Sequence, residues 1–327
     1  MLNKITLPTF IITILFATSC YAQINPSPEL QKWQSTGQHF DFNGHKIFYH
    51  DSKGASDNVI IMIHGFPTSS WDWRHLWQAM KPDYRLVSLD MLGFGFSDKP
   101  QDYAYSINEQ VDLQLALLAE LGIKNAHLLV HDYGTYVAQE MLARFNNKTT
   151  PGIALAIQSL VILNGPVIPE QLQLRFIQKV FNSPFGWIAS QFTNRFLFER
   201  NFRPIFGKQT QPSSQALKDD WFVISQQKGQ RLSHKLIHYY NESLQRRERW
   251  LTAIRETEVP VLSISGLADP VSGKSMVEKY IELVPGSNVI VLKDIGHYPH
   301  VEDATSVTTH YREFIGSLIK ETQDEKQ

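Results

Sequence analysis

The fold of this chain is decided by the stretch Leu128-Leu129-Val130-His131-Asp132-Tyr133-Gly134-Thr135-Tyr136-Val137-Ala138. Its apolar first part predicts a buried strand, its last part predicts a helix, and one tight turn joins them. This is the context of a nucleophile elbow, in which the turn strains its central residue and lifts that side chain above the sheet edge. The central residue is Asp132, and a carboxylate can attack carbon and form a covalent ester. Aspartate at a strand–helix junction is also a common helix N-cap, so the stretch alone leaves both roles open.

Further buried strands are predicted on both sides of this stretch. Apolar runs at 59–63, 85–89, 159–163, 261–264 and 288–292 are typical of strands buried on both faces. A hairpin with a tight turn at Asn43-Gly44 precedes them. Helical patterns at 107–121, 136–145, 275–283 and 307–319 alternate with the strands. The alternation predicts an α/β fold with a mostly parallel sheet and helices on both faces.

Residues 166–250 interrupt this alternation. They contain no convincing buried strand, and their helical pieces are rich in aromatic residues. We interpret this segment as an inserted helical cap on an α/β core formed by residues 23–165 and 251–327. The cap aromatics are expected to pack against the core, and some to line a pocket. They are Phe176, Phe181, Phe185, Trp187, Phe192, Phe196, Phe198, Phe202, Phe206, Trp221 and Phe222.

The composition excludes several classes of protein. The chain has 327 residues, 43% hydrophobic and 19% charged, so it can bury a sizeable core and is not mainly disordered or fibrous. Its 31 basic and 32 acidic residues balance, which gives no general attraction to nucleic acid. A single cysteine, Cys20, excludes an intramolecular disulfide and a cysteine-rich metal site.

The first 22 residues predict a signal peptide. A charged start at Lys4, an apolar run from Ile5 to Ala17 and small residues up to Ala22 form its three parts. The run is shorter than the roughly 20 residues of a membrane span. Cleavage after Ala22 predicts an exported protein, periplasmic or secreted, with no membrane span in the mature chain. Alternatively, Cys20 lies in a sequence that resembles a lipobox and could carry a lipid anchor.

Three further motifs follow predicted strands. Gly65-Phe66 comes after the strand at 59–63, where glycine lets the backbone approach a ligand and an N–H group can serve an oxyanion hole. Asp269 follows the strand at 261–264, beside the expected ligand crevice of an open sheet. His297 follows the last strand, and a loop histidine can be a general base. Each motif alone also suits an ordinary loop. Together, the chain order Asp132, Asp269, His297 is that of nucleophile, acid and histidine in the α/β-hydrolase fold.

With these motifs the chain resembles α/β-hydrolases of the epoxide hydrolase and haloalkane dehalogenase type, from about residue 43 to 319. Within that type it is most similar to the mesoderm-specific transcript group and its bacterial relatives. The resemblance is carried by the motifs at 64–70, 89–100, 131–134, 269–271 and 297–303.

The resemblance implies a role for each site residue. Asp132 is the nucleophile, His297 the base that activates water, and Asp269 the partner that orients His297. The backbone N–H groups of Phe66 and Tyr133 form the oxyanion hole, and no metal or organic cofactor is required. With an ordinary histidine pKa of about 6.5, activity is expected to fall on the acid side as His297 takes up a proton.

Some positions depart from the family pattern. Tyr133 stands where haloalkane dehalogenases have a halide-binding Trp, and Phe66 where they have Asn or Trp. Epoxide hydrolases use two separated cap tyrosines as proton donors. The cap tyrosines here are the adjacent Tyr239 and Tyr240, so the resemblance offers one of them as the cap proton donor but no separated pair. The sequence predicts an epoxide hydrolase-like enzyme for a small apolar epoxide, halide or ester. The alternatives are a haloalkane dehalogenase-like enzyme and a binding protein that kept the fold without turnover.

Overall fold

The structure is a computed structural model that describes residues 25–54, 56, 58–147 and 155–324. The predicted signal peptide at 1–22, with Cys20, lies outside these residues. No helix in the described part is long and apolar enough to span a bilayer.

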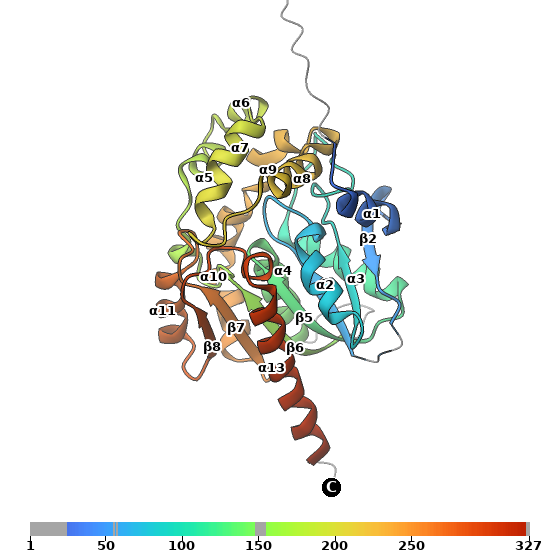
Figure 1. Cartoon of the computed structure of the whole chain (residues 1–327). Helices are drawn as coiled ribbons and strands as arrows, with labels where there is room; N and C mark the ends of the chain where they lie inside the picture. The colour runs from blue at the N-terminus through green and yellow to red at the C-terminus, as the bar shows by residue number, and fades with distance from the viewer. Residues whose placement is uncertain (1–24, 55, 57, 148–154, 325–327) are drawn as a thin grey trace, which may run out of the picture.

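An eight-stranded sheet forms the centre of the described chain (Figure 1). The strands run in the order β1-β2-β4-β3-β5-β6-β7-β8. β1 and β2 pair antiparallel, as do β2 and β4, and all other neighbours are parallel. The mostly parallel sheet confirms the predicted fold class. The strand bounds are β1 (Gln38–Phe42), β2 (His45–Asp51), β3 (Val59–Ile63), β4 (Arg85–Leu89), β5 (Asn125–His131), β6 (Ala156–Leu163), β7 (Val261–Gly266) and β8 (Asn288–Leu292).

Helices cover both faces of this sheet because successive strand residues point to opposite sides. In β3, Ile61 joins one hydrophobic cluster, whereas Ile60 and Met62 join another. The first cluster includes side chains of α3 (Ile107–Glu120), α4 (Tyr133–Asn146) and α11 (Lys274–Leu283). The second includes those of α1 (Pro28–Thr36), α2 (Arg74–Met80) and α13 (Ala304–Asp324). The short helix α12 (Pro299–Glu302) precedes α13.

Between β6 and β7 the described chain forms helices and no strand, and α5 to α9 gather beyond one end of the sheet (Figure 1). These helices are α5 (Phe176–Phe181), α6 (Gly186–Gln191), α7 (Arg195–Phe202), α8 (Ser214–Ser225), α9 (Ser233–Leu236) and α10 (Tyr239–Arg255). The predicted cap boundary at residue 250 falls inside α10. There, Trp250 is buried and its Nε1 donates to Glu140 of α4 at 2.8 Å, so one helix belongs to both parts.

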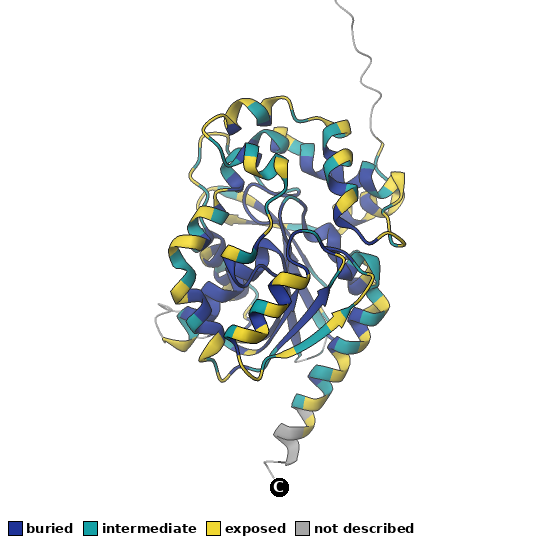
Figure 2. Cartoon of the chain, turned by 90° about the vertical axis from the view of Figure 1, so that its left-hand side faces the viewer, coloured by how far each residue is buried: buried dark blue, intermediate teal, exposed yellow. Residues whose placement is uncertain are grey.

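The eleven cap aromatics fall into three groups: five are buried, five are exposed, and Phe222 is half-buried. Phe181, Phe198, Phe202, Phe206 and Trp221 are buried, as predicted. Five others are 59–81% exposed, so the prediction that they pack against the core is wrong: Phe176, Phe185, Trp187, Phe192 and Phe196. They lie on or beside α5, α6 and α7, at the cap end of the molecule, where Figure 2 shows much exposed ribbon.

Candidate active site

Asp132 forms the turn between β5 and α4. Its backbone has φ +46° and ψ −117°, a strained conformation for a residue with a side chain. The helix then passes so close to β3 that a Cβ on Gly134 would lie 2.4 Å from the carbonyl oxygen of Ile63. The Asp132 side chain makes no capping bond to α4, which removes the N-cap interpretation and leaves its carboxylate for other partners.

The two oxygens of the Asp132 carboxylate have different neighbours. The backbone N–H of Phe66 donates to Oδ1 at 2.8 Å. This approach needs Gly65, since a Cβ there would lie 2.7 Å from Cβ of Asp132. Oδ2 instead lies 3.5 Å from Nε2 of His297. Oδ1 therefore occupies the position of an oxyanion, while Oδ2 is available to attack.

The second predicted oxyanion donor, Tyr133, is the first residue of α4. Its backbone N–H has no acceptor inside the helix, because the first amides of a helix lack one. In the described part of the chain no hydrogen bond joins this N–H group to the Asp132 carboxylate.

His297 lies between the two predicted aspartates. Its Nδ1 donates to Oδ2 of Asp269 at 2.8 Å, and its Nε2 faces Asp132. All three side chains are buried. The structure thus brings together three residues that are 28 to 165 positions apart in the sequence, with the imidazole in the orientation that a base beside Asp132 requires.

Charge sets the protonation of this trio. Burial by itself lowers the pKa of His297, but the carboxylates of Asp269 and Asp132 outweigh burial and raise it to about 10. Burial raises the pKa of Asp132, yet His297 and the Phe66 N–H reverse this and lower it. The pKa of Asp269 is also lowered, since its hydrogen bonds and His297 overcome burial. The expectation that His297 titrates near its ordinary pKa is therefore wrong for the resting site, which holds an imidazolium between two carboxylates.

This charge arrangement predicts different pH profiles for two steps at Asp132. An ester on Asp132 has no charge, so its formation removes one of the groups that raise the pKa of His297. Ester formation needs only ionised Asp132 and should be constant between about pH 5.5 and 8. Ester hydrolysis needs neutral His297, so its rate should rise with pH to a plateau. Quenched-flow single turnovers resolve the two rates, and parallel pH profiles would contradict this assignment.

Asn164 is a site residue that the sequence analysis missed. It follows β6 directly, with φ +38°, and its Nδ2 donates to Oδ2 of Asp269 at 2.8 Å. The backbone N–H and hydroxyl of Ser272 donate to the same oxygen at 3.0 and 2.8 Å. These donors hold Asp269 in its charged form and fix the oxygen that orients His297. The available signal was a polar residue at a strand end, as at Asp132.

Glu302 is a second missed residue, and it holds the histidine loop against the cap. Its Oε2 accepts from the backbone N–H groups of Gly296 and Gly207, at 2.9 and 2.8 Å, and its Oε1 accepts from that of Tyr298. The N–H of His297 also donates to a cap residue, the carbonyl of Ile205, at 2.8 Å. The position of the base therefore depends on the docked cap.

The structure places the two cap tyrosines differently. The ring centroid of Tyr239 lies 5.0 Å from that of Tyr133 and 5.9 Å from that of Phe66. Its hydroxyl is buried and has no hydrogen-bond partner in the described part of the chain. Burial and the nearby charge of Asp132 raise the pKa of Tyr239, so the hydroxyl keeps its proton. Tyr240 is half-buried and makes no ring contact or side-chain hydrogen bond with the trio in the same part of the chain.

A cavity of about 100 Å³ lies between the cap and the core, beside the trio. Phe66 and His297 form its floor on the core side, and α5, α7 and α8 contribute most of its remaining walls. Its walls are mainly apolar, as expected for an apolar ligand. The apolar lining residues are Phe66, Pro67, Ile177, Phe181, Leu197, Phe198, Phe202, Ile205, Trp221, Ile224 and Val271.

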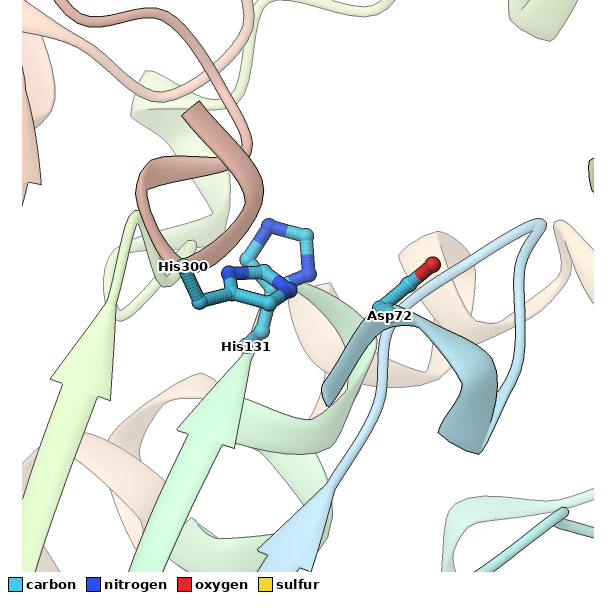
Figure 3. Close-up of side chains that lie close together, drawn as sticks. All are labelled: Asp72, His131 and His300. Atoms are coloured by element: carbon cyan, nitrogen blue, oxygen red, sulfur yellow. The ribbon is translucent and has the colours of Figure 1, made fainter. Parts of the chain in front are cut away.

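Asp72, His131 and His300 form a buried cluster, and His131 directly precedes Asp132 in the chain (Figure 3). Each offers an atom that could bind a metal ion, and these atoms lie within 4.8 Å of one another. His131 Nε2 donates to the carbonyl of His297 at 2.8 Å, which leaves its Nδ1 unprotonated, and burial lowers its pKa to about 3. Neutral His131 thus supports the backbone of the base, and the hydrolytic steps derived below use no metal at this cluster.

Comparisons with known proteins agree with the observed fold. Residues 58–304 match the family described as the alpha/beta hydrolase fold. The chain is 38% identical to the human mesoderm-specific transcript homolog protein over 92% of both chains, which agrees with the predicted resemblance. It is 34% identical to LipZ of Mycobacterium tuberculosis, named as a hydrolase, over 84% of this chain and 94% of LipZ. Its fold is similar to the crystal structure of a loop variant of the haloalkane dehalogenase DbeA from Bradyrhizobium elkanii, with a TM-score of 0.74. The two chains are 19% identical, and the match covers 88% of this chain and 99% of the DbeA variant.

Proposed function

The chain belongs to the α/β-hydrolase family and is a hydrolase, and from that premise we propose that it works through a covalent ester on Asp132. The observation that carries this proposal is the unequal environment of the two Asp132 oxygens. Oδ1 is held by the Phe66 N–H, and Oδ2 faces His297. An aspartate that caps a helix or has a structural role does not need its two oxygens in different environments, whereas a carboxylate nucleophile does.

In the first step, Oδ2 of Asp132 attacks an electrophilic carbon in the cavity and the leaving group departs. With an epoxide, the ring C–O bond breaks and the oxygen takes a proton from the hydroxyl of Tyr239. As the charge on Asp132 disappears, His297 gives up its own proton to solvent, and the Tyr239 oxygen takes a proton back from solvent, so its hydroxyl is restored. With a halide, the halide ion leaves and the proton of His297 passes to solvent.

In the second step, Nε2 of His297 takes a proton from water, and the hydroxide oxygen attacks Cγ of Asp132. Charge develops on Oδ1, where the Phe66 N–H already donates, so this donor is in place before the reaction begins. The bond between Cγ and Oδ2 then breaks, and the departing oxygen takes the second proton of the attacking water, which releases the alcohol. The resting pair of Asp132 carboxylate and His297 imidazolium is restored.

The proposed substrate is a small apolar epoxide, halide or ester. The apolar cavity supports an apolar substrate, and its small volume supports a small reacting group. The buried hydroxyl of Tyr239 supports an epoxide hydrolase-like reaction, because a departing oxygen needs a proton and a departing halide does not. A haloalkane dehalogenase-like reaction is the second candidate, supported by the likeness in fold to DbeA alone.

Tyr239→Phe separates these two reactions. With an epoxide we expect ring opening to slow by about 10² to 10⁴-fold, the range for loss of one general acid. With a haloalkane, whose halide leaves without a proton, the same variant should change the rate little. Tyr240→Phe is the matched control, since it removes an adjacent hydroxyl outside the site. If both variants lose the same share of epoxide turnover, or if Tyr239→Phe keeps full epoxide turnover, Tyr239 is not the proton donor.

A panel of epoxides, haloalkanes and esters on the native protein and on Asp132→Ala tests the proposed function. We expect turnover of at least one class by the native protein and none by the variant. If the native protein binds members of the panel in its cavity but turns over none, it is the binding protein named above as an alternative. If the variant keeps its activity, the ester on Asp132 is excluded.

A further inference from the structure

A patch of exposed apolar side chains lies on the outer cap. We call it the cap patch and define it as Phe176, Phe185, Trp187, Ile188, Phe192 and Phe196. Of the nine large hydrophobic residues that are exposed in the described chain, these six fall within 21 positions, at exposures of 39–81%. They belong to α5, α6, α7 and the links between them, at the end of the molecule remote from the C-terminal end of α13 (Figure 1). Such a concentration marks an interaction surface.

The side chains of the cap patch do not belong to the hydrophobic core or to the cavity wall. On α5, Phe176 is exposed whereas its neighbours Ile177 and Phe181 line the cavity. On α7, Phe196 is exposed whereas Leu197 and Phe198 line the cavity. The inner faces of these helices are thus already occupied. The exposed rings cannot turn inward without displacing the cavity wall, and no part of the chain that the structure describes covers them.

The surroundings of the cap patch are positively charged. Between residues 171 and 208 the chain has six basic residues and one acidic residue, although its net charge is −1. The acidic residue, Glu199, is paired with Arg195. Lys179 and Arg200 are exposed. A second copy of this chain would therefore present the same positive charge to the cap patch, which disfavours a contact between copies.

We propose that the cap patch docks the protein onto an anionic lipid bilayer. Aromatic rings, tryptophan in particular, bind at the boundary between headgroups and acyl chains. Basic side chains beside them bind the lipid phosphates, and both contributions strengthen attachment to an anionic surface. Phe and Trp supply the apolar contacts here, and Lys179 and Arg200 supply exposed positive charge at the same end of the cap.

Docking in this orientation has a consequence for the substrate. α5 and α7 carry cap patch residues on their outer faces and cavity residues on their inner faces. A bilayer against the outer faces lies next to the cavity wall, so an apolar substrate dissolved in lipid can enter without crossing bulk water. This consequence rests on the proposed function, whereas the docking itself does not.

Trp187 provides a direct test with the full chain. It is 59% exposed, and the other six tryptophans are each at most 7% exposed, so lipid contact should change the fluorescence of Trp187 alone. With vesicles of equal parts phosphatidylglycerol and phosphatidylcholine, we expect a blue-shifted emission and quenching by brominated acyl chains. Trp187→Phe should abolish the quenching. Vesicles of pure phosphatidylcholine, or high salt, should weaken binding.

Vesicle co-sedimentation with a triple variant, Phe185→Ser, Trp187→Ser and Phe192→Ser, isolates the contribution of the cap patch. We expect binding to fall roughly 100-fold, as three aromatic side chains lose their apolar contact. The control variant Ile281→Ser with Val291→Ser removes two apolar side chains that are each 50% exposed but lie outside the cap, and it should bind like the native chain. Both variants keep the N-terminal segment, so any membrane affinity of that segment is the same in both and does not affect the comparison between them.

Three results would overturn the proposal. The first is undiminished binding by the triple variant, which would assign binding to another part of the chain. The second is an absence of quenching of Trp187 in bound protein. The third is a native dimer that the triple variant dissolves, together with no vesicle binding, which would make the cap patch a contact between copies. None of these measurements uses turnover, so failure of the proposed function would leave them unaffected.

Discussion

His297→Gln is expected to stop the reaction after one ester has formed on each molecule. Oδ2 of Asp132 keeps its freedom to attack, but glutamine cannot take a proton from water, so the ester on Asp132 persists. Turnover should fall by about 10² to 10⁴-fold, the range for loss of one general base. Mass spectrometry of the peptide that carries Asp132 should show the added mass of the whole substrate for an epoxide, or of the substrate without its halide for a haloalkane.

His310→Gln is the matched control for this variant. His310 lies on α13, where it pairs with Glu313 near the surface, far in sequence from the trio. It should turn over substrate at the native rate and accumulate no adduct. If His297→Gln accumulates no adduct with a substrate that the native enzyme turns over, the roles of Asp132 as nucleophile and His297 as base are wrongly assigned.

Asp132→Ala is expected to abolish both ester formation and turnover, by about 10⁴-fold or more, as for removal of a nucleophile. It also removes one of the two carboxylates that raise the pKa of His297, so that pKa should fall. NMR titration of the His297 ring measures this shift. Asp294→Ala, an exposed loop aspartate close to His297 in sequence, is the control and should change neither turnover nor the titration.

The elbow and the strand ends were predictable because short-range chemistry determines them. The apolar runs at 59–63, 85–89 and 288–292 are strands with those bounds, and a tight turn between strand and helix leaves room for one residue, Asp132. The sequence analysis began the following helix at residue 136, whereas α4 begins at Tyr133, because periodicity is weak over the first turn of a helix. The adjacent His131 extends β5 although it is polar, since its ring is hydrogen-bonded.

The supporting contacts of the site were not predictable from local patterns. Asn164 reaches Asp269 across 105 positions of sequence, and Glu302 reaches Gly207 across 95, so neither role is visible in a short window. The pKa of His297 was misjudged for the same reason, because it depends on two carboxylates that meet only in the folded chain. The rule that aromatic residues are buried failed for the cap patch because other residues of α5 and α7 already line the cavity and the patch residues face outward.

The central claim, a covalent ester on Asp132, is tested most directly by one turnover in water enriched in ¹⁸O, with enzyme in excess over substrate. Because water attacks Cγ of Asp132 and the Cγ–Oδ2 bond then breaks, we predict that the label enters the peptide carrying Asp132 and that the product oxygen is unlabelled. Label in the product with none in Asp132 would mean that water attacks the substrate directly, and it would contradict the account.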